Sequence, residues 1–193
     1  MPQINPDYLR EYSQGCKIFI ETGTYLGTGV EIVRNTNMFD EIHSIEIEEH
    51  LYKMAVEKFK DDPRVKIWHG DSPDVLREKI LPNIKDRVTF WLDSHCMGSA
   101  PHVPNGTPGS FKYGKCPLLF EVDVIKEFGI KDHIIFMDDQ RLFDTHYWDF
   151  VKREDYLRKV SEINPEYKFK WLDGGFSDGQ QHEPDDIIVA YLE

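Results

Sequence analysis

Apolar residues along the chain alternate between short runs typical of buried strands and longer stretches in which they recur at helical spacing. Runs rich in β-branched and aromatic residues predict strands over 17–20, 41–46, 65–69, 88–92 and 133–137. Helical spacing predicts helices over 6–14, 30–35, 50–60, 117–128 and 149–163, and Ser72-Pro73 predicts another helix with Ser72 as N-cap. This alternation indicates a parallel sheet with helices on both faces.

The last two predicted strands, 167–172 and 186–192, break this alternation. About a dozen residues separate them, beginning with a predicted turn at 173–175, and no helix lies between them. A parallel crossover needs more chain, so these two strands are expected to pair antiparallel. The predicted fold class is therefore α/β: a Rossmann-like, seven-stranded, mostly parallel sheet with one antiparallel strand near the edge, formed by a single domain over 1–193.

The segment 94–115 has a different composition from the rest of the chain. It contains four glycines, three prolines and two histidines and shows no apolar period. Long segments of this kind inside a compact domain are usually functional. We expect a lid or substrate loop here, with His102, Lys112 and Tyr113 as candidate substrate contacts.

A glycine turn follows the first predicted strand, in the sequence KIFIETGTYLGTGV over 17–30. Glu21 ends the apolar run, and Gly23, Gly27 and Gly29 come before the next helix. Glycines let the backbone approach a ligand closely, and the helix start offers free N–H groups. The pattern predicts a nucleotide-type binding loop, but its G-x-x-x-G-x-G spacing is not the G-x-G-x-x-G dinucleotide fingerprint.

Acidic residues stand at the carboxyl ends of successive predicted strands. They are Glu21, Glu46, Asp71, Asp93 and Asp138. In open α/β sheets ligands bind outside these ends, so the acids are expected to surround one site. Glu46 is placed to accept hydrogen bonds from both hydroxyls of a ribose.

The motif E-x-G-x-x-x-G at Glu21 resembles the first motif of the class I S-adenosylmethionine (SAM) methyltransferases. Gly70-Asp71-Ser72 resembles the "G-D-[SA]" position that receives the adenine amino group in that family. The resemblance implies SAM as cofactor. The binding residues that it implies are Glu21, Gly23, Thr24, Gly27, Glu46, Asp71, Ser72 and Asp93.

Two further acidic segments, Trp91-Leu-Asp93-Ser-His95 and Phe136-Met-Asp138-Asp139, end strands that are neighbours in this fold. Carboxylates crowded at one edge repel one another unless protons or a cation neutralise them, and such oxygen clusters suit Mg²⁺ or a similar ion.

This pattern resembles the metal-dependent catechol and macrocin (TylF-type) O-methyltransferases, which implies Asp93, Asp138 and Asp139 as ligands of Mg²⁺ or another divalent cation. Asp93 and His95 are the predicted catalytic residues, His95 as base or fourth ligand. Cys96 stands where the catechol enzymes carry a lysine base, and a site without metal remains an alternative.

The composition limits the classes of partner that the protein is expected to bind. The net charge of −12 argues against nucleic acid as a main partner, and no apolar run is long enough to cross a membrane. Without a signal-peptide pattern, a cytoplasmic location is expected, with Cys16, Cys96 and Cys116 as reduced thiols. The sequence does not determine the oligomeric state.

These patterns predict a SAM-dependent methyltransferase that uses a divalent metal to methylate a hydroxyl of a small molecule or sugar. Two alternatives stay open: a methyltransferase-like module that binds SAM without transfer, and an NAD-dependent Rossmann enzyme.

Overall fold

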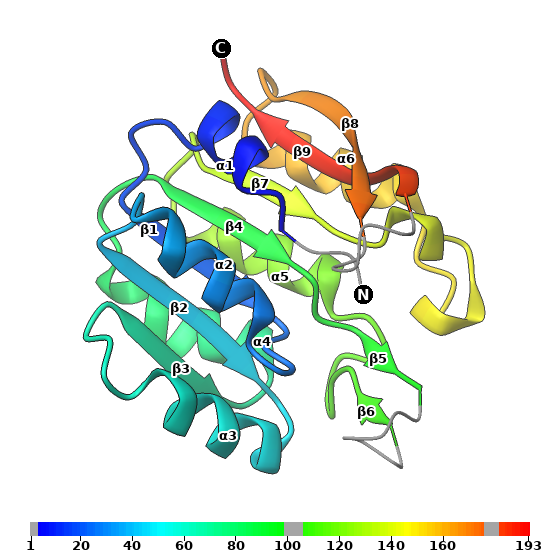
Figure 1. Ribbon diagram of the computed structural model, residues 1–193. Helices are drawn as coiled ribbons and strands as arrows, with labels where there is room; N and C mark the ends of the chain where they lie inside the picture. The colour runs from blue at the N-terminus through cyan, green and yellow to red at the C-terminus, as the bar shows by residue number, and fades with distance from the viewer. Residues whose placement is uncertain (1–3, 99–105, 176–181) are drawn as a thin grey trace.

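The computed structural model describes residues 4–98, 106–175 and 182–193 (Figure 1). Seven strands form one sheet in the order β3-β2-β1-β4-β7-β9-β8. Their bounds are β1 Ile18–Thr22, β2 Glu41–Glu46, β3 Val65–His69, β4 Val88–Leu92, β7 Ile134–Met137, β8 Lys168–Gly175 and β9 His182–Tyr191. The helices are α1 Pro6–Tyr12, α2 Thr28–Thr36, α3 Glu49–Phe59, α4 Ser72–Val75, α5 Leu118–Glu127 and α6 Arg153–Ile163.

Strand direction within the sheet agrees with the prediction. β1 pairs in parallel with β2 and β4, and β4 pairs in parallel with β7. β9 runs antiparallel to both of its neighbours, β7 and β8. The predicted fold class, a mostly parallel seven-stranded sheet with one reversed strand near the edge, is confirmed.

Successive side chains of the central strands enter two separate cores, because neighbouring residues on a strand face opposite sides. Phe90 packs with the side chains of α4, α5 and α6, and its neighbour Trp91 packs with those of α1, α2 and α3. Figure 1 shows α1 and α2 in front of the sheet and α5 and α6 behind it. All five residues of β4 are buried, which explains the continuous apolar run in its sequence.

The helix that was predicted to follow an N-cap at Ser72 begins one residue earlier, at Ser72 itself. Asp71, not Ser72, is the N-cap, and its side chain makes no capping hydrogen bond. The Ser72 hydroxyl instead donates to the carboxyl group of Glu121. After Val75 the chain continues as a π-helical turn, Leu76–Ile80, and a 3₁₀ turn, Leu81–Asn83.

The end of the chain also differs from the sequence prediction. Residues 173–175, expected as a turn, belong to β8, because β9 already begins at His182 and pairs with Gly174 and Gly175. The last helix begins at Arg153 rather than 149. A 3₁₀ turn, His146–Trp148, precedes it.

The segment 94–115 is partly tied to the domain. β5 (Cys96–Met97) and β6 (Thr107–Pro108) pair antiparallel within it. Gly109, at φ 75°, packs so closely that a Cβ there would lie 2.2 Å from the Lys115 carbonyl oxygen. His102 lies outside the described residues.

Among the helices that the structure describes, none has the length and apolar character to cross a membrane.

Replacing Phe90 by alanine tests the two-core arrangement. Phe90 is 0% exposed at the centre of the sheet, so Phe90→Ala should lower the free energy of unfolding by about 3–5 kcal/mol, as measured by urea denaturation. Phe150, which is 64% exposed, serves as the control, and Phe150→Ala should change it by less than about 0.5 kcal/mol. Equal effects of the two substitutions would contradict this core.

Candidate functional site

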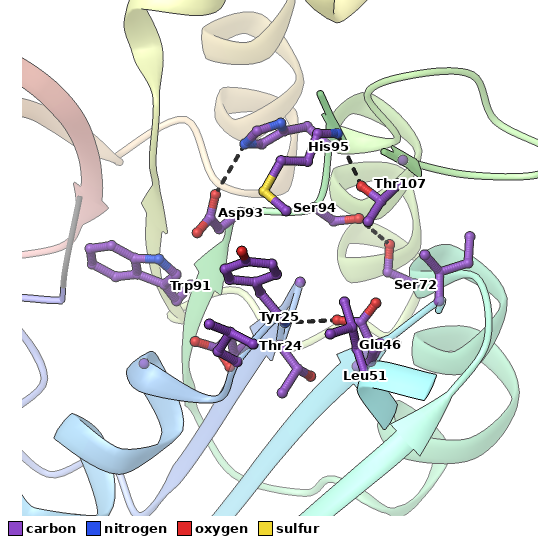
Figure 2. Close-up of a pocket in the computed structure, with 18 of the residues that line it drawn as sticks. Thr24, Tyr25, Glu46, Leu51, Ser72, Trp91, Asp93, Ser94, His95 and Thr107 are labelled. Carbon is purple, nitrogen blue, oxygen red and sulfur yellow. Dashed lines mark hydrogen bonds and ion pairs between the residues drawn. The ribbon is translucent and has the colours of Figure 1, made fainter. Parts of the chain in front are cut away.

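A cavity of about 360 Å³ opens at the carboxyl edge of the sheet, at the ends of β1, β2 and β4 (Figure 2). This volume lies within the range of small-molecule sites. The sequence-predicted site residues that line it are Glu21, Gly23, Thr24, Glu46, Ser72, Asp93 and His95. The edge predicted from strand ends is therefore hollow, and these residues share its wall.

The glycine turn forms one wall of the cavity and is held against β2. The backbone N–H groups of Gly23 and Thr24 donate to the Ile45 carbonyl over 3.0 and 3.1 Å. Gly23 has φ 89°, and a Cβ there would lie 2.5 Å from the Asp93 carbonyl oxygen. Only glycine fits this position, because both the backbone angle and the close approach exclude a side chain.

Glu46 is buried at the end of β2 with its carboxylate fixed by the turn. Its Oε2 accepts from the Tyr25 N–H at 2.7 Å, and its Oε1 accepts from the Glu48 N–H at 2.9 Å. Burial raises the pKa of Glu46, and these backbone donors oppose the rise. Each oxygen keeps a lone pair for a ligand hydroxyl, as expected for an acid that binds a ribose.

Tyr25, which the sequence did not single out, also lines the cavity, between Glu46 and Asp93 in Figure 2. Its φ of 48° is uncommon for a residue other than glycine. This backbone conformation accompanies the hydrogen bond to Glu46 and places the Tyr25 ring in the cavity.

Glu21 is buried near the end of β1 and is held by the Ser44 hydroxyl, which is itself bonded to Thr24. Ser44 donates to its Oε2 at 2.5 Å, and Thr24 lies 2.6 Å from the Ser44 oxygen. A Cβ at Gly29 would lie 1.9 Å from Glu21 Oε1, so the third glycine of the turn makes room for this carboxyl group. Burial raises the pKa of Glu21 to about 8, so the group is mostly protonated at neutral pH.

Two residues predicted to bind the cofactor lie outside the cavity lining. The Asp71 side chain faces the segment after β6, where its Oδ2 accepts from the Phe111 N–H at 3.3 Å. Gly27, at φ 72°, packs against the Phe59 ring, 2.6 Å from where its Cβ would be. The flanking residues Gly70 and Ser72 do line the cavity. Asp71 therefore holds the loop, and Gly27 supports the packing of α3.

His95 joins the two acidic segments that follow β4 and β7. Its Nε2 lies 2.8 Å from Asp139 Oδ2 and 3.5 Å from Asp93 Oδ1, and its Nδ1 lies 2.9 Å from the Cys96 carbonyl oxygen. Burial alone would lower the His95 pKa, but hydrogen bonds to Asp139 and Asp93 outweigh it and raise the pKa well above its ordinary value. His95 is therefore an imidazolium that donates from both nitrogens.

Arg141 is another residue beside the site that sequence reasoning missed. Its Nη1 lies 2.6 Å from Asp139 Oδ1, at an angle that makes the contact ionic rather than a directed hydrogen bond. The same guanidinium binds Asp186, and the Arg141 N–H donates to Asp186 Oδ1 at 3.1 Å. Its place two residues after Asp139 was the available signal. Together with His95, it supplies the positive charge that the sequence analysis assigned to a metal ion or protons.

The acids at this edge of the sheet differ in the direction in which their surroundings shift their pKa values. Burial and the nearby charges of Asp93 and Asp139 raise the Asp138 pKa well above its ordinary value. Burial also raises the pKa of Asp93, to about 6. For Asp139, burial acts in the same direction, but His95 and Arg141 outweigh it and lower the pKa.

The structure groups the predicted metal ligands differently from the sequence. Asp93, His95 and Asp139 can present ligand atoms within 4.8 Å of one another, as can Asp138, Asp139 and Asp186. Asp93 and Asp138 are not in the same group, because Asp139 adopts φ 61° and the Asp138 carboxylate turns back to accept from the Asp139 N–H at 2.9 Å. Two carboxylates and an imidazole nevertheless fit a divalent cation chemically, with His95 as a ligand once its Nε2 has given up its proton.

The candidate substrate contacts after β6 bind the scaffold. Tyr113 and Lys112 both hydrogen-bond to Asp74 and do not line the cavity, whereas Met97 and Thr107 of the small sheet do. Trp148 is buried with its ring 5.8 Å from that of His95, so it supports this imidazole.

The protonated state of Glu21 gives a test by pH. Between its ordinary pKa of 4.5 and about 8, the folded protein keeps a proton that the unfolded chain has lost. Stability therefore falls as pH rises through this window, by up to about 1.4 kcal/mol per pH unit from this group. Urea denaturation from pH 5 to 8 should give a shallower slope for Glu21→Gln than for wild type. The exposed control, Glu57→Gln, should keep the wild-type slope, and a wild-type slope in Glu21→Gln would show that Glu21 is ionised in the fold.

No protein-family model matches the sequence, and no curated protein matches it. Solved structures do resemble the fold. An O-methyltransferase from Bacillus cereus in complex with S-adenosylhomocysteine (SAH) aligns at TM-score 0.59 and 14% identity over 97% of this chain and 78% of that one. The methyltransferase domain of bacterial CtHen1 aligns at 0.57 and 16% over 96% and 94%. Spermidine synthase from Thermotoga maritima aligns at 0.56 and 13% over 93% and 54%.

These identities are too low to transfer an activity, but the alignments cover 96–97% of the chain at TM-scores of 0.57 and 0.59. The chain has the Rossmann-like fold of the class I SAM-dependent methyltransferases.

Proposed function

We propose that this protein is a SAM-dependent methyltransferase that transfers a methyl group to a hydroxyl oxygen of a small molecule or sugar. The observation that carries the proposal is Glu46, a buried carboxylate fixed by Tyr25 and Glu48 at the mouth of a cavity of about 360 Å³. An acid in this position, beside a glycine turn, suits the hydroxyls of a ribose. The B. cereus protein of the same fold holds SAH, the demethylated product of SAM.

The chemistry of the cavity wall favours SAM over a dinucleotide. The acids Glu46 and Asp93 line the cavity, Glu21 lines it in its mostly protonated form, and no lysine or arginine lines it among the described residues. This lining suits a sulfonium cation and opposes the anionic pyrophosphate of NAD. NAD binding stays the weaker alternative on this ground.

Methyl transfer to a hydroxyl requires that the acceptor oxygen lose its proton. His95 already carries its proton, so in this state it orients Asp93 and Asp139 rather than accepting a proton. Asp93 reaches the cavity, and burial raises its pKa to about 6, which places it near the value that suits a base at neutral pH. A divalent cation held by Asp93, His95 and Asp139, when bound, would lower the pKa of the acceptor hydroxyl.

Calorimetric titration with SAH tests the cofactor assignment. Glu46→Gln should raise the dissociation constant tenfold or more, because a charged acceptor for the ribose hydroxyls becomes neutral. Glu49→Gln, at an exposed acid three residues away, should stay within about twofold of wild type. An unchanged affinity in Glu46→Gln, or no heat of binding in wild type, would remove the assignment.

The alternative function is a module that binds SAM without transferring its methyl group. The ion pair between His95 and Asp139 favours it, because a protonated His95 cannot act as a base. Radiolabelled SAM incubated with a panel of hydroxylated acceptors, with Mg²⁺ or with a chelator, separates the two functions. Label in any acceptor supports the enzyme, and binding without transfer under both conditions supports the module.

Metal binding is tested at Asp139, which belongs to both candidate groups. Mg²⁺ or Mn²⁺ should raise the melting temperature of the wild type, and Asp139→Asn should abolish this rise while SAH affinity stays within about threefold. Asp144 is the matched control, because it is an exposed aspartate with a similar backbone angle, φ 59° against 61°. A metal response that persists in Asp139→Asn would show that these are not the ligands.

A further inference from the structure

Glu121 is a carboxyl group that the proposed reaction does not use. It lies on α5 and is 0% exposed. Burial raises its pKa to about 7, while hydrogen bonds from Ser72 and Thr22 oppose the rise. A buried carboxyl group on a helix that otherwise packs apolar residues against the sheet needs a reason beyond packing.

The reason lies in the hydrogen-bond partner of Glu121, Ser72, which belongs to the cavity wall. The Ser72 hydroxyl donates to Glu121 Oε1 and lies 3.3 Å from the Ser94 hydroxyl. Both serines line the cavity, whereas Glu121 lies behind them. Glu121 therefore reaches a ligand only through the Ser72 hydroxyl.

This part of the wall has the features of a slot for a nucleoside base. Ser72 and Leu51 lie on the same side of the cavity as Glu46 in Figure 2, and Ile47 also lines the cavity. If Glu46 holds the ribose, the base extends from it along Leu51 and Ile47, which suit its apolar faces. Its polar edge then meets the hydroxyl of Ser72.

A serine hydroxyl has one proton and two lone pairs, and its rotation normally lets it donate or accept. Because Ser72 gives its proton to the ionised Glu121, it meets the Ser94 hydroxyl as an acceptor and offers the cavity its remaining lone pair. The wall at this point is therefore an acceptor. A base with an exocyclic amino group at this point can donate a hydrogen bond to the wall. A base with a carbonyl group there would place a second acceptor against it.

We propose that Glu121 is a positioning residue that fixes the Ser72 hydroxyl as an acceptor, so that the cavity selects a 6-aminopurine nucleoside over its 6-oxo analogue. The inference rests on the proposed function, because it assumes that the ligand is a nucleoside held by Glu46. It adds a determinant of base choice that touches no ligand atom itself.

The experiment compares SAH with S-inosylhomocysteine, in which a carbonyl replaces the 6-amino group, by calorimetric titration at pH 8. Wild type should bind SAH at least about tenfold more tightly, because the analogue leaves buried polar atoms unpaired. Glu121→Leu, of similar volume, should reduce this ratio to about threefold or less. Glu121→Gln keeps an oxygen acceptor for Ser72 and should retain most of the ratio.

Three further measurements make the outcome decisive. Melting temperatures check that each variant is folded, and the ratio of the two affinities is insensitive to a general loss of stability. Glu127→Gln, at an exposed acid of the same helix, should keep the wild-type ratio. Asp71→Asn tests the neighbouring carboxylate as a competing acceptor.

The inference is overturned if wild type binds both ligands equally, if Glu121→Leu keeps the ratio, or if Asp71→Asn alone abolishes it. Each of these outcomes leaves SAH binding, and so the proposed function, in place. Absence of SAH binding in wild type would instead remove the proposed function.

Discussion

The burial of several carboxyl groups at one edge of the sheet is the constraint on which the rest of this site depends. Ionised carboxylates are expensive to bury unless donors or cations compensate them. The protein meets this cost differently at each position. Glu46 is compensated by backbone N–H groups and Glu21 by a proton and a hydroxyl, whereas Asp139 faces His95 and Arg141. The edge thus has a half compensated by neutral donors and a half compensated by cations.

Asp93 connects these two halves. Its side chain contacts His95, its N–H donates to the Thr22 carbonyl, and its own carbonyl lies against Gly23. The glycine turn and the acidic segment after β4 are therefore packed as one unit, and a side chain at Gly23 would disturb both. In the proposed function, this contact would fix the distance between a nucleoside bound over the turn and an acceptor bound beside Asp93, as transfer between two ligands requires.

The sequence allowed the sheet to be predicted because the central strands have uniform environments. Val88–Leu92 is buried throughout, and its apolar run predicts a strand with the observed bounds. The start of β9 was missed because 182–186 contains a proline and three acids, which are depleted in strands, although these residues pair with two glycines of β8.

The acids at the strand ends allowed the position of the cavity to be predicted, but not the residues to which those acids bind. Glu121 and Arg141 act across 49 and 45 residues of chain to reach Ser72 and Asp186, and local patterns carry no information on such contacts. Asp139 adopts a left-handed conformation that Asp tolerates better than most residues, but the sequence does not indicate which of two adjacent aspartates adopts it.

The charge of the half that is compensated by cations bears on which ligand could bind beside it. Burial and neighbouring charges raise the pKa of Asp138, so it carries less of the negative charge than its neighbours do. Among the described residues, His95 and Arg141 are the cations that contact Asp93, Asp139 and Asp186. Asp93 lines the cavity and is the least compensated of the three, because its oxygen lies 3.5 Å from His95 Nε2, whereas the Asp139 oxygen lies 2.8 Å from the same nitrogen. A sulfonium ion beside Asp93 would balance its charge. In the proposed reaction the sulfur would become neutral when the methyl group leaves, so this carboxylate would attract a sulfonium donor more strongly than its neutral product.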